Sequence, residues 1–334
     1  MIEPPAQAAH REQELRPQRT EIRVRGKTIA VPSVCIQGRR VIVKGKWIKL
    51  ATLEDEDCLE GNIVENPDMF LDELKRGPLR ADLFSFGQKP TQPKPQYGYH
   101  LEWDNAAVIP IADYASWWEK LPQETRRNVR KATKQGVEVR VTPFTDELVR
   151  GIVDIYNETP VRQGRKFWHY GKSFDMVKKE AGTYLERSEF IGAYFQGSLI
   201  GFAKLLYVDK CGTIMFILSQ EQHADKRPTN ALIAKCVEVC AERGCTSFQY
   251  RKYVYGANEA NSLTEFKRRN GFEHVRFPRY YIPLSAVGAV VLKLGLHHGL
   301  VHYLPRHVST LLRALRKWAL EVPRKKSPTP AKAG

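Results

Sequence analysis

A short segment, residues 266–273, most constrains what this chain can fold into. Its first residues end a stretch with the apolar spacing of a helix, and the residues after it have the Tyr- and Phe-rich pattern of a strand. Gly271 stands between the two, where the residue after a helix adopts a left-handed conformation. We therefore expect a helix over 260–270 followed at once by a strand over 272–283. By itself this pattern indicates only an αβ unit, and most such units carry no chemistry.

The second half of the chain continues this alternation. From residue 189 onward, the periods of the apolar residues predict the order strand, strand, strand, helix, strand, helix, strand. Helices are expected at 114–120, 122–135, 145–157, 173–182, 228–243 and 260–270. Strands are expected at 137–142, 189–195, 199–208, 212–219, 246–251 and 272–283.

The first half is richer in strand patterns. Apolar residues alternate with polar ones through 21–50, with turns at Gly26 and Gly38. A short helix is expected at 67–76. Further strands are expected at 81–86, 99–103 and 106–111. Residues 1–20 are polar and expected to be disordered. We therefore divide the chain into a disordered start, 1–20, a β-rich half, 21–112, and an α/β domain, 113–284.

The unit at 266–273 and this strand order resemble the GNAT acyltransferase fold. The spelling Phe-Lys-Arg-Arg-Asn-Gly-Phe-Glu is most similar to the Fem-type, BioF2-like branch, the peptidyltransferases that add amino acids to peptidoglycan precursors. A second segment, residues 126–137, is similar to a basic segment of Fem-like chains. The resemblance covers about residues 80–284. It implies a GNAT-like mixed β-sheet flanked by helices, with a degenerate or truncated copy in the first half.

The charge points to anionic partners. The chain has 53 Lys and Arg against 37 Asp and Glu, a formal net charge of +16, which favours phosphate, nucleic acid or an acidic membrane. Half of this excess lies after residue 283. There, residues 285–322 have the pattern of two basic amphipathic helices, which either anchor the protein at a membrane or pack on the domain or a twin subunit. Residues 323–334 are expected to be a disordered tail.

The cellular location follows from what the sequence lacks. The N-terminus has no apolar core of a signal peptide, and no run of about 18 apolar residues occurs. The six cysteines form no CxxC pair and are expected to be buried free thiols in a reducing cytosol. We expect a cytoplasmic protein, peripheral at the inner face of the membrane if residues 285–322 bind it.

Two basic segments are candidates for an acceptor site. On the helix at 122–135, like charges lie in rows that an anion could bridge, as a phosphate or diphosphate clamp; the alternative is a solvated basic helix. The loop at 156–170 combines basic side chains, which could hold phosphates, with aromatic rings, which could stack on a nucleotide base or a sugar. The alternative is that these residues only pack within the protein. The predicted acceptor-binding residues are Arg126, Arg127, Arg130, Arg162, Arg165, Trp168, His169 and Tyr170.

The donor is expected at the start of the helix at 228–243, because a helix N-terminus binds anions. The candidates are Lys226, Arg227, Thr229 and Asn230. The glycine-rich motif with which GNAT acetyltransferases hold the acetyl-CoA pyrophosphate is missing here. The Fem-type resemblance therefore implies another acyl donor, such as aminoacyl-tRNA, and leaves acyl-CoA as the alternative. No permanently bound cofactor and no metal are expected.

Acyl transfer needs a base for the attacking amine, a stabiliser for the oxyanion and an acid for the leaving group. We expect Glu158 as the base, Lys252 at the oxyanion and Tyr255 as the proton donor; the alternative is that the tyrosines only pack. The predicted function is an acyl- or aminoacyltransferase that forms an amide on a phosphate-bearing cell-envelope or polysaccharide precursor. The alternatives are an acyl-CoA-dependent N-acyltransferase and a non-enzymatic protein that binds nucleic acid or a membrane. The oligomeric state stays open.

Overall fold

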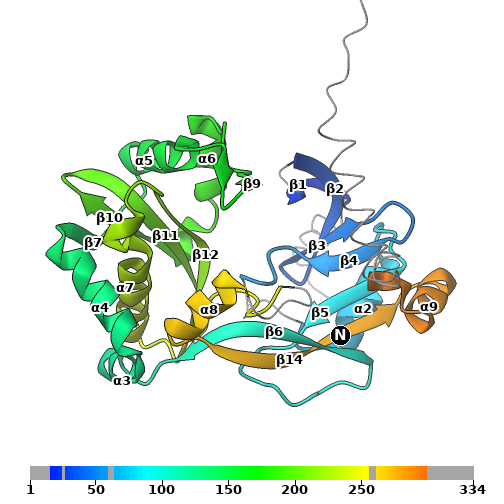
Figure 1. Cartoon of the computed structure of the whole chain (residues 1–334). Helices are drawn as coiled ribbons and strands as arrows, with labels where there is room; N and C mark the ends of the chain where they lie inside the picture. The colour runs from blue at the N-terminus through cyan, green and yellow to red at the C-terminus, as the bar shows by residue number, and fades with distance from the viewer. Residues whose placement is uncertain (1–15, 25–26, 59–63, 256–260, 299–334) are drawn as a thin grey trace, which may run out of the picture.

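The computed structural model describes residues 16–24, 27–58, 64–255 and 261–298. Within these residues a twelve-stranded mixed sheet runs through both halves of the chain, in the order β1-β2-β3-β4-β5-β14-β6-β13-β12-β11-β10-β7. Helices cover the sheet in both halves (Figure 1). The predicted GNAT-like mixed α/β fold is confirmed.

In the first half, the strands β1 to β4 form an antiparallel meander, and β5 is added to it in parallel. One helix, α2, packs on it, because its buried face carries Phe70, Leu71 and Leu74 and its start is capped by Asn66. The strand β4 then pairs with β5 in parallel. The elements are β1 (Gln18–Val24), β2 (Lys27–Ile36), β3 (Arg39–Lys44), β4 (Leu50–Leu53), α2 (Pro67–Arg76) and β5 (Leu83–Gly87).

Two long strands join the halves. The strand β6 (His100–Pro110) and the last strand β14 (Glu273–Pro283) pair antiparallel over nine residue pairs. The strand β14 also pairs with β5 of the first half, and β6 pairs with β13 of the second. Figure 1 shows both strands running along the bottom of the view, from one half to the other. The two halves therefore share one continuous sheet.

The second half is a sheet between two layers of helices. The helices α3, α4 and α7 share one apolar core with the inner strands, whereas α5 and α6 share another on the opposite face. The helices are α3 (Tyr114–Lys120), α4 (Gln123–Lys134), α5 (Asp146–Asn157), α6 (Phe174–Ala181), α7 (Pro228–Glu242) and α8 (Ser262–Arg269). The strands are β7 (Val137–Thr142), β10 (Ser188–Phe195), β11 (Ser198–Val208), β12 (Cys211–Ser219) and β13 (Ser247–Gln249).

Short elements complete the fold. A two-stranded hairpin, β8 (Val161–Arg162) with β9 (Arg165–Lys166), lies outside the main sheet. The single-turn helices are η2 (Leu185–Arg187), η3 (Ala224–Lys226) and η4 (Leu296–His298). The helix α9 (Ala286–Lys293) packs beside β14.

The stop after α8 forms as the sequence predicts. Gly271 has a φ of +84°, the left-handed region that a residue with a side chain adopts only at a cost. A Cβ at this position would also lie 2.9 Å from Nε1 of Trp117. Both the backbone conformation and the close approach of α3 therefore require glycine here.

Three expectations differ from the structure. The strand β1 begins at Gln18, inside the segment expected to be disordered, because it pairs with β2. The strands expected at 99–103 and 106–111 are one strand, β6. The strand expected at 246–251 is shorter, because the chain after Gln249 leaves β12. Of the segment 285–322, only α9 and η4 lie within the described residues, and no helix described there or elsewhere is long and apolar enough to cross a membrane.

Candidate functional site

The central strands β12 and β13 separate toward their carboxyl ends. They pair in parallel over only three positions, Cys211 to Thr213 against Ser247 to Gln249. Beyond this, β12 continues along β11 to Ser219, whereas the chain after β13 follows β6, since Tyr250 N–H donates to the carbonyl oxygen of Ala107 at 2.9 Å. A gap between adjacent strands at their carboxyl ends is where ligands bind in α/β sheets.

An open groove of about 520 Å³ lies at this separation. The end of β12 forms one wall, and Tyr250 with the helix α8 forms the other. The start of α7 closes one end. The lining residues used below are Arg162, Phe167, Ser219, Thr229, Tyr250 and Phe266.

The N-terminus of α7 faces this groove. Residue Arg227 precedes it in the left-handed region at φ +59°, Pro228 occupies its first turn, and no described side chain caps it. Thr229 contributes its hydroxyl to the groove and shares a hydrogen bond of 2.8 Å with the hydroxyl of Ser219. Uncapped N–H groups and the helix dipole favour an anion at this end.

The four residues predicted to bind the donor are therefore only partly together. Thr229 lines the groove and Arg227 is exposed beside it. Lys226 instead pairs with Asp225 and lies over the Phe195 ring at 4.8 Å. Asn230 donates its side-chain amide to Asn270 at the end of α8, 3.1 Å away, so it positions α7 against α8.

A buried lysine lies behind the wall of the groove. Lys267 on α8 is fully buried, and its ammonium donates to the carbonyl oxygens of Tyr250, at 3.0 Å, and of Lys252. It lies over the rings of Tyr250 and Tyr255, at 4.4 and 5.1 Å from their centroids. Burial, with a smaller effect of Arg251, lowers the pKa of Lys267 to about 7. A lysine with this pKa exchanges its proton at neutral pH.

The two tyrosines beside Lys267 are proton donors, not phenolates, at neutral pH. Burial raises the pKa of Tyr250 to about 12 and also raises the pKa of Tyr255. Tyr250 lines the groove, whereas Tyr255 is exposed. The structure thus brings the predicted acid Tyr255 next to a lysine that we did not predict.

Glu158 and Arg162 form a structural pair at the mouth of the groove. The Arg162 guanidinium donates to Glu158, at 2.8 Å, and to the carbonyl oxygens of Ile155 and Ser219. Both Glu158 oxygens also accept backbone N–H groups of the loop after β12, at 2.8 and 2.9 Å. These contacts fix the hairpin β8–β9 to that loop. They favour a positioning role for both residues over the predicted roles of base and phosphate ligand.

Of the other predicted acceptor-binding residues in the loop at 156–170, one is packed against the protein and three are exposed. His169 packs on the Tyr156 ring, with centroids 4.3 Å apart, and its Nδ1 lies 2.8 Å from Nζ of Lys172. Arg165, Trp168 and Tyr170 are exposed. These three side chains can therefore meet a partner beside the groove, which keeps them as predicted acceptor contacts.

The basic helix α4 packs on α7 with its opposite face. Thr125 and Ala132 are buried, whereas Arg127 and Arg130 are exposed and Arg126 is half-buried. Arg130 lies over the Trp118 ring at 5.6 Å. The Thr125 hydroxyl donates to the carbonyl oxygen of Arg269, so the start of α4 lies beside the end of α8. Arg127 and Arg130 are thus open to an anion on the face of α4 that points away from α7.

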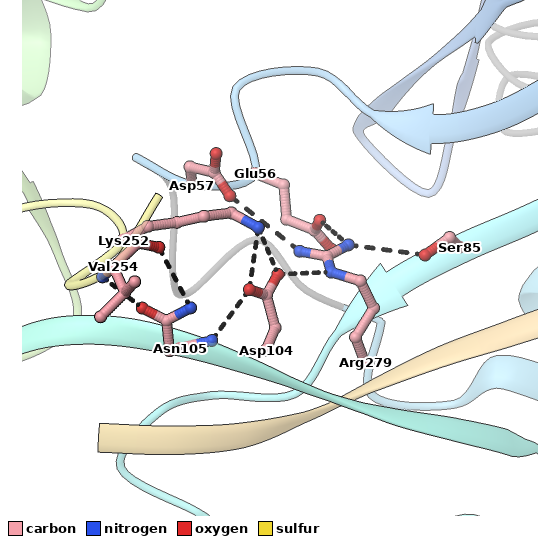
Figure 2. Close-up of polar contacts among 8 residues, drawn as sticks. All are labelled: Glu56, Asp57, Ser85, Asp104, Asn105, Lys252, Val254 and Arg279. Atoms are coloured by element: carbon pink, nitrogen blue, oxygen red, sulfur yellow. Dashed lines mark hydrogen bonds and ion pairs between the residues drawn. The ribbon is translucent and has the colours of Figure 1, made fainter. Parts of the chain in front are cut away.

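Lys252 lies in a different site, where the two halves meet (Figure 2). Its ammonium binds both oxygens of Asp104 on β6, at 2.8 and 3.0 Å. Arg279 on β14 binds the same carboxylate at 2.9 Å and Glu56 at 2.8 Å. Burial alone would raise the pKa of Asp104, but Arg279 and Lys252 outweigh it, so this pKa lies below its usual range. The structure does not bring Lys252 to the groove.

The sequence of the second half matches a known domain family. The family model of the acetyltransferase (GNAT) domain matches residues 120–268. The match covers less than half of the chain, and this part of it is similar to a GNAT domain. The predicted acyltransferase class is thereby confirmed. The groove between β12 and β13, the start of α7 and Lys267 all lie within the matched residues, whereas β6 and β14 lie outside them.

Solved structures share the fold at low identity. A crystal structure of FemX is 10% identical, with 85% of this chain and 92% of the FemX chain covered and a TM-score of 0.54. The structure of L-PGS from Bacillus licheniformis is 12% identical, with coverages of 77% and 84% and a TM-score of 0.48. The FemX likeness shows that the two halves of the chain together share the fold of that structure. No curated protein matches the sequence significantly.

Two features of the site carry little signal in the sequence. Lys267 stands in a run with Arg268 and Arg269, and nothing local distinguishes the buried base from its exposed neighbours. Asp104 and Arg279 are 175 positions apart, and only the pairing of β6 with β14 brings them together. The helix period offers one clue to the burial of Lys267. Thr264, Lys267 and Asn270 are three positions apart and share one face of α8, and Asn270 is buried.

Proposed function

We propose that this protein transfers an acyl or aminoacyl group to an amine of a phosphate-bearing acceptor, a cell-envelope or polysaccharide precursor. The observation that carries the proposal is the groove between β12 and β13, with an anion-binding helix end beside it and Lys267 behind its wall. The Fem-type spelling of residues 266–273 supports an aminoacyl donor over acetyl-CoA.

The groove gives each part of the donor a place. The N–H groups at the start of α7 favour the anionic part, and Arg227 adds a positive charge there. The acyl carbonyl then lies toward Tyr250 and Ser219, where the strands separate. The absence of glycine between Gly212 and Gly244 leaves no flexible loop to wrap a pyrophosphate at this helix. This favours a donor whose phosphates are held along a surface.

Lys267 is the group best suited to move the proton. The acceptor amine attacks the acyl carbon, a C–N bond forms, and the ester or thioester bond breaks. The amine loses one proton and the leaving oxygen or sulfur gains one. With its pKa at about 7, Lys267 can accept the first and supply the second through Tyr250 or Tyr255. Its positive form also stabilises the oxyanion.

The acceptor is expected on the exposed basic and aromatic surface. Arg165, Trp168 and Tyr170 stand beside the groove on the hairpin side, and Arg126, Arg127 and Arg130 stand on α4. Arginine binds phosphate in a bidentate manner, and aromatic rings stack on a base or sugar. These residues fit an acceptor that is larger than a single amino acid and carries phosphate.

Transfer of a labelled amino acid tests the proposal. The purified full-length protein is incubated with aminoacyl-tRNA and a nucleotide-linked peptidoglycan precursor, and label in the precursor is counted. Lys267→Met is expected to lower turnover by about a hundredfold or more, the usual effect of losing a group that stabilises the transition state. Lys120→Met, which removes an exposed lysine of α3, is the matched control and should not change turnover.

Two results would contradict this reading. Full turnover in Lys267→Met would remove the lysine from the mechanism. Tight binding of acetyl-CoA in calorimetry, with no transfer from aminoacyl-tRNA, would favour the second candidate, an acyl-CoA-dependent N-acyltransferase. Lys252→Met separates the two sites, because Lys252 lies at Asp104 and not at the groove.

A further inference from the structure

Three histidines and a glutamate gather far along the sheet from the groove. The Oε1 atom of Glu102 lies 2.7 Å from Nε2 of His297, 3.0 Å from Nε2 of His298 and 3.5 Å from Nε2 of His100. Three of these residues, His100, Glu102 and His297, have ligand atoms that all lie within 4.8 Å of one another. The cluster belongs to no part of the proposed transfer site.

The fold builds this cluster from two distant segments. His100 and Glu102 are two positions apart on β6, so their side chains leave the same face of the strand. The partner of His100 on β14 is Tyr281, whose ring lies 4.7 Å from the ring of His297. The helix α9 then returns along β14 and places η4, with His297 and His298, over Glu102.

The helix that delivers these histidines sits tightly on the sheet. A Cβ at Gly288 would lie 1.8 Å from the carbonyl oxygen of Asp82, and Ser285 both caps α9 and donates to Asp82 at 3.0 Å. Val291 is buried against the sheet. The side chain of His297 is only 2% exposed. The position of the His297 imidazole is therefore set by packing, which is what a preformed ligand site requires.

Hydrogen bonds account for two of the three histidines. A carboxylate oxygen offers two lone pairs, and Oε1 of Glu102 accepts hydrogen bonds from His297 and His298, whereas Nε2 of His100 stands 3.5 Å away. Around a tetrahedral zinc ion with bonds of about 2.0–2.1 Å, neighbouring ligand atoms lie about 3.3 Å apart. The three measured separations, 2.7, 3.0 and 3.5 Å, scatter around this value. A shared cation would join His100 to Glu102 and His297, whose ligand atoms lie within 4.8 Å of one another.

We propose that His100, Glu102 and His297 form a zinc site, with His298 beside them. Imidazole nitrogens and a carboxylate oxygen are ligands that Zn²⁺ accepts, whereas Mg²⁺ and Ca²⁺ prefer oxygen ligands. The role of this site is to fasten α9 and η4 to the start of β6.

Zinc binding by the full chain, freed of any purification tag, tests the site. After dialysis against zinc and then against buffer, the protein is expected to hold one zinc per molecule by mass spectrometry and to ignore Mg²⁺. The Glu102→Gln variant keeps an oxygen that accepts hydrogen bonds from the histidines but weakens metal binding, so it should lose zinc. His297→Ala should lose it as well. His274→Ala, a histidine on β14 outside the cluster, should keep it.

Thermal unfolding separates metal binding from simple packing. Added zinc should raise the midpoint of wild type and of His274→Ala, but not that of Glu102→Gln, because a ligand stabilises only the state that binds it.

Three outcomes would overturn the proposal. One is a wild-type protein that holds no zinc and binds it with a Kd weaker than about 100 µM, far from the affinity of a structural site. Another is a Glu102→Gln variant that binds as tightly as wild type. The third is loss of zinc in a His302→Ala, His307→Ala double variant with zinc retained in His297→Ala, which would assign the metal to histidines outside the described residues.

Discussion

Replacing Lys267 by methionine should change how the stability of the protein depends on pH. The side chain is fully buried, and its pKa is lowered to about 7 chiefly by that burial. In the unfolded chain the same lysine titrates near 10.5. The folded protein therefore releases this proton first, and the unfolded chain binds more protons between the two values. The contribution of Lys267 to the free energy of unfolding must therefore rise with pH between the folded and the unfolded pKa value.

The size of the effect follows from the two pKa values. Lowering a pKa from 10.5 to about 7 penalises the charged form in the folded protein by about 5 kcal/mol, at about 1.4 kcal/mol per pH unit. The full penalty applies below about pH 7 and disappears above about pH 10.5. Between about pH 7 and about pH 9, the free energy of unfolding of wild type relative to Lys267→Met should therefore rise by about 2 kcal/mol.

Urea denaturation at a series of pH values measures this difference. The variant leaves the carbonyl oxygens of Tyr250 and Lys252 without their lysine donor, which shifts its stability by an amount that does not depend on pH. Only the slope of the difference reports the titration. Lys120→Met, on the surface of α3, should give a flat difference. A flat difference for Lys267→Met as well would refute the argument that burial controls this proton, and with it the proposed proton transfer.

Two further predictions concern the junction and the C-terminal helix. Asp104→Asn should destabilise the protein by about 3 kcal/mol in urea denaturation, because it breaks the buried pair with Arg279; a loss no larger than that of Lys252→Met would contradict this. Removing residues 285–334 should abolish sedimentation with anionic vesicles, since α9 exposes Val287, Val290 and Leu294. A full-length protein that ignores such vesicles at low salt would instead make α9 a packing element.

Local structure could be predicted closely because its signals are local. The predicted starts of α2 and α5 agree with the structure to within a residue, since Asn66 and Thr145 cap them. The alternation of apolar residues likewise gave β7 and β10 to β12 nearly complete. The stop at Gly271 could be predicted because its backbone conformation excludes most other residues.

Long-range pairing could not be predicted from these signals. No local sequence pattern indicates that β14 inserts between β5 and β6. The division predicted between 21–112 and 113–284 therefore cuts across a sheet that is continuous. The site shared this difficulty. The strand order is enough to expect Thr229 and Tyr255 near the groove. It leads to the same expectation for Lys252, because the sequence does not reveal that Lys252 pairs with Asp104. The His297 and His298 cluster depends on the same pairing, through the position of α9.

The insertion of β14 has a consequence for how the chain is made. Leu83 on β5 pairs with Leu50 on one side, but its partner on the other side is Pro283, so most of the protein is synthesised before that second edge can be paired. At about 5–20 residues per second, the nascent chain carries the open edge for about 10–40 s. The strand concerned includes Phe84 and Phe86, both fully buried at the end, and an unpaired apolar edge of this kind recruits other chains. The order of synthesis therefore leaves the β5 edge open to pairing with other chains until β14 has been made.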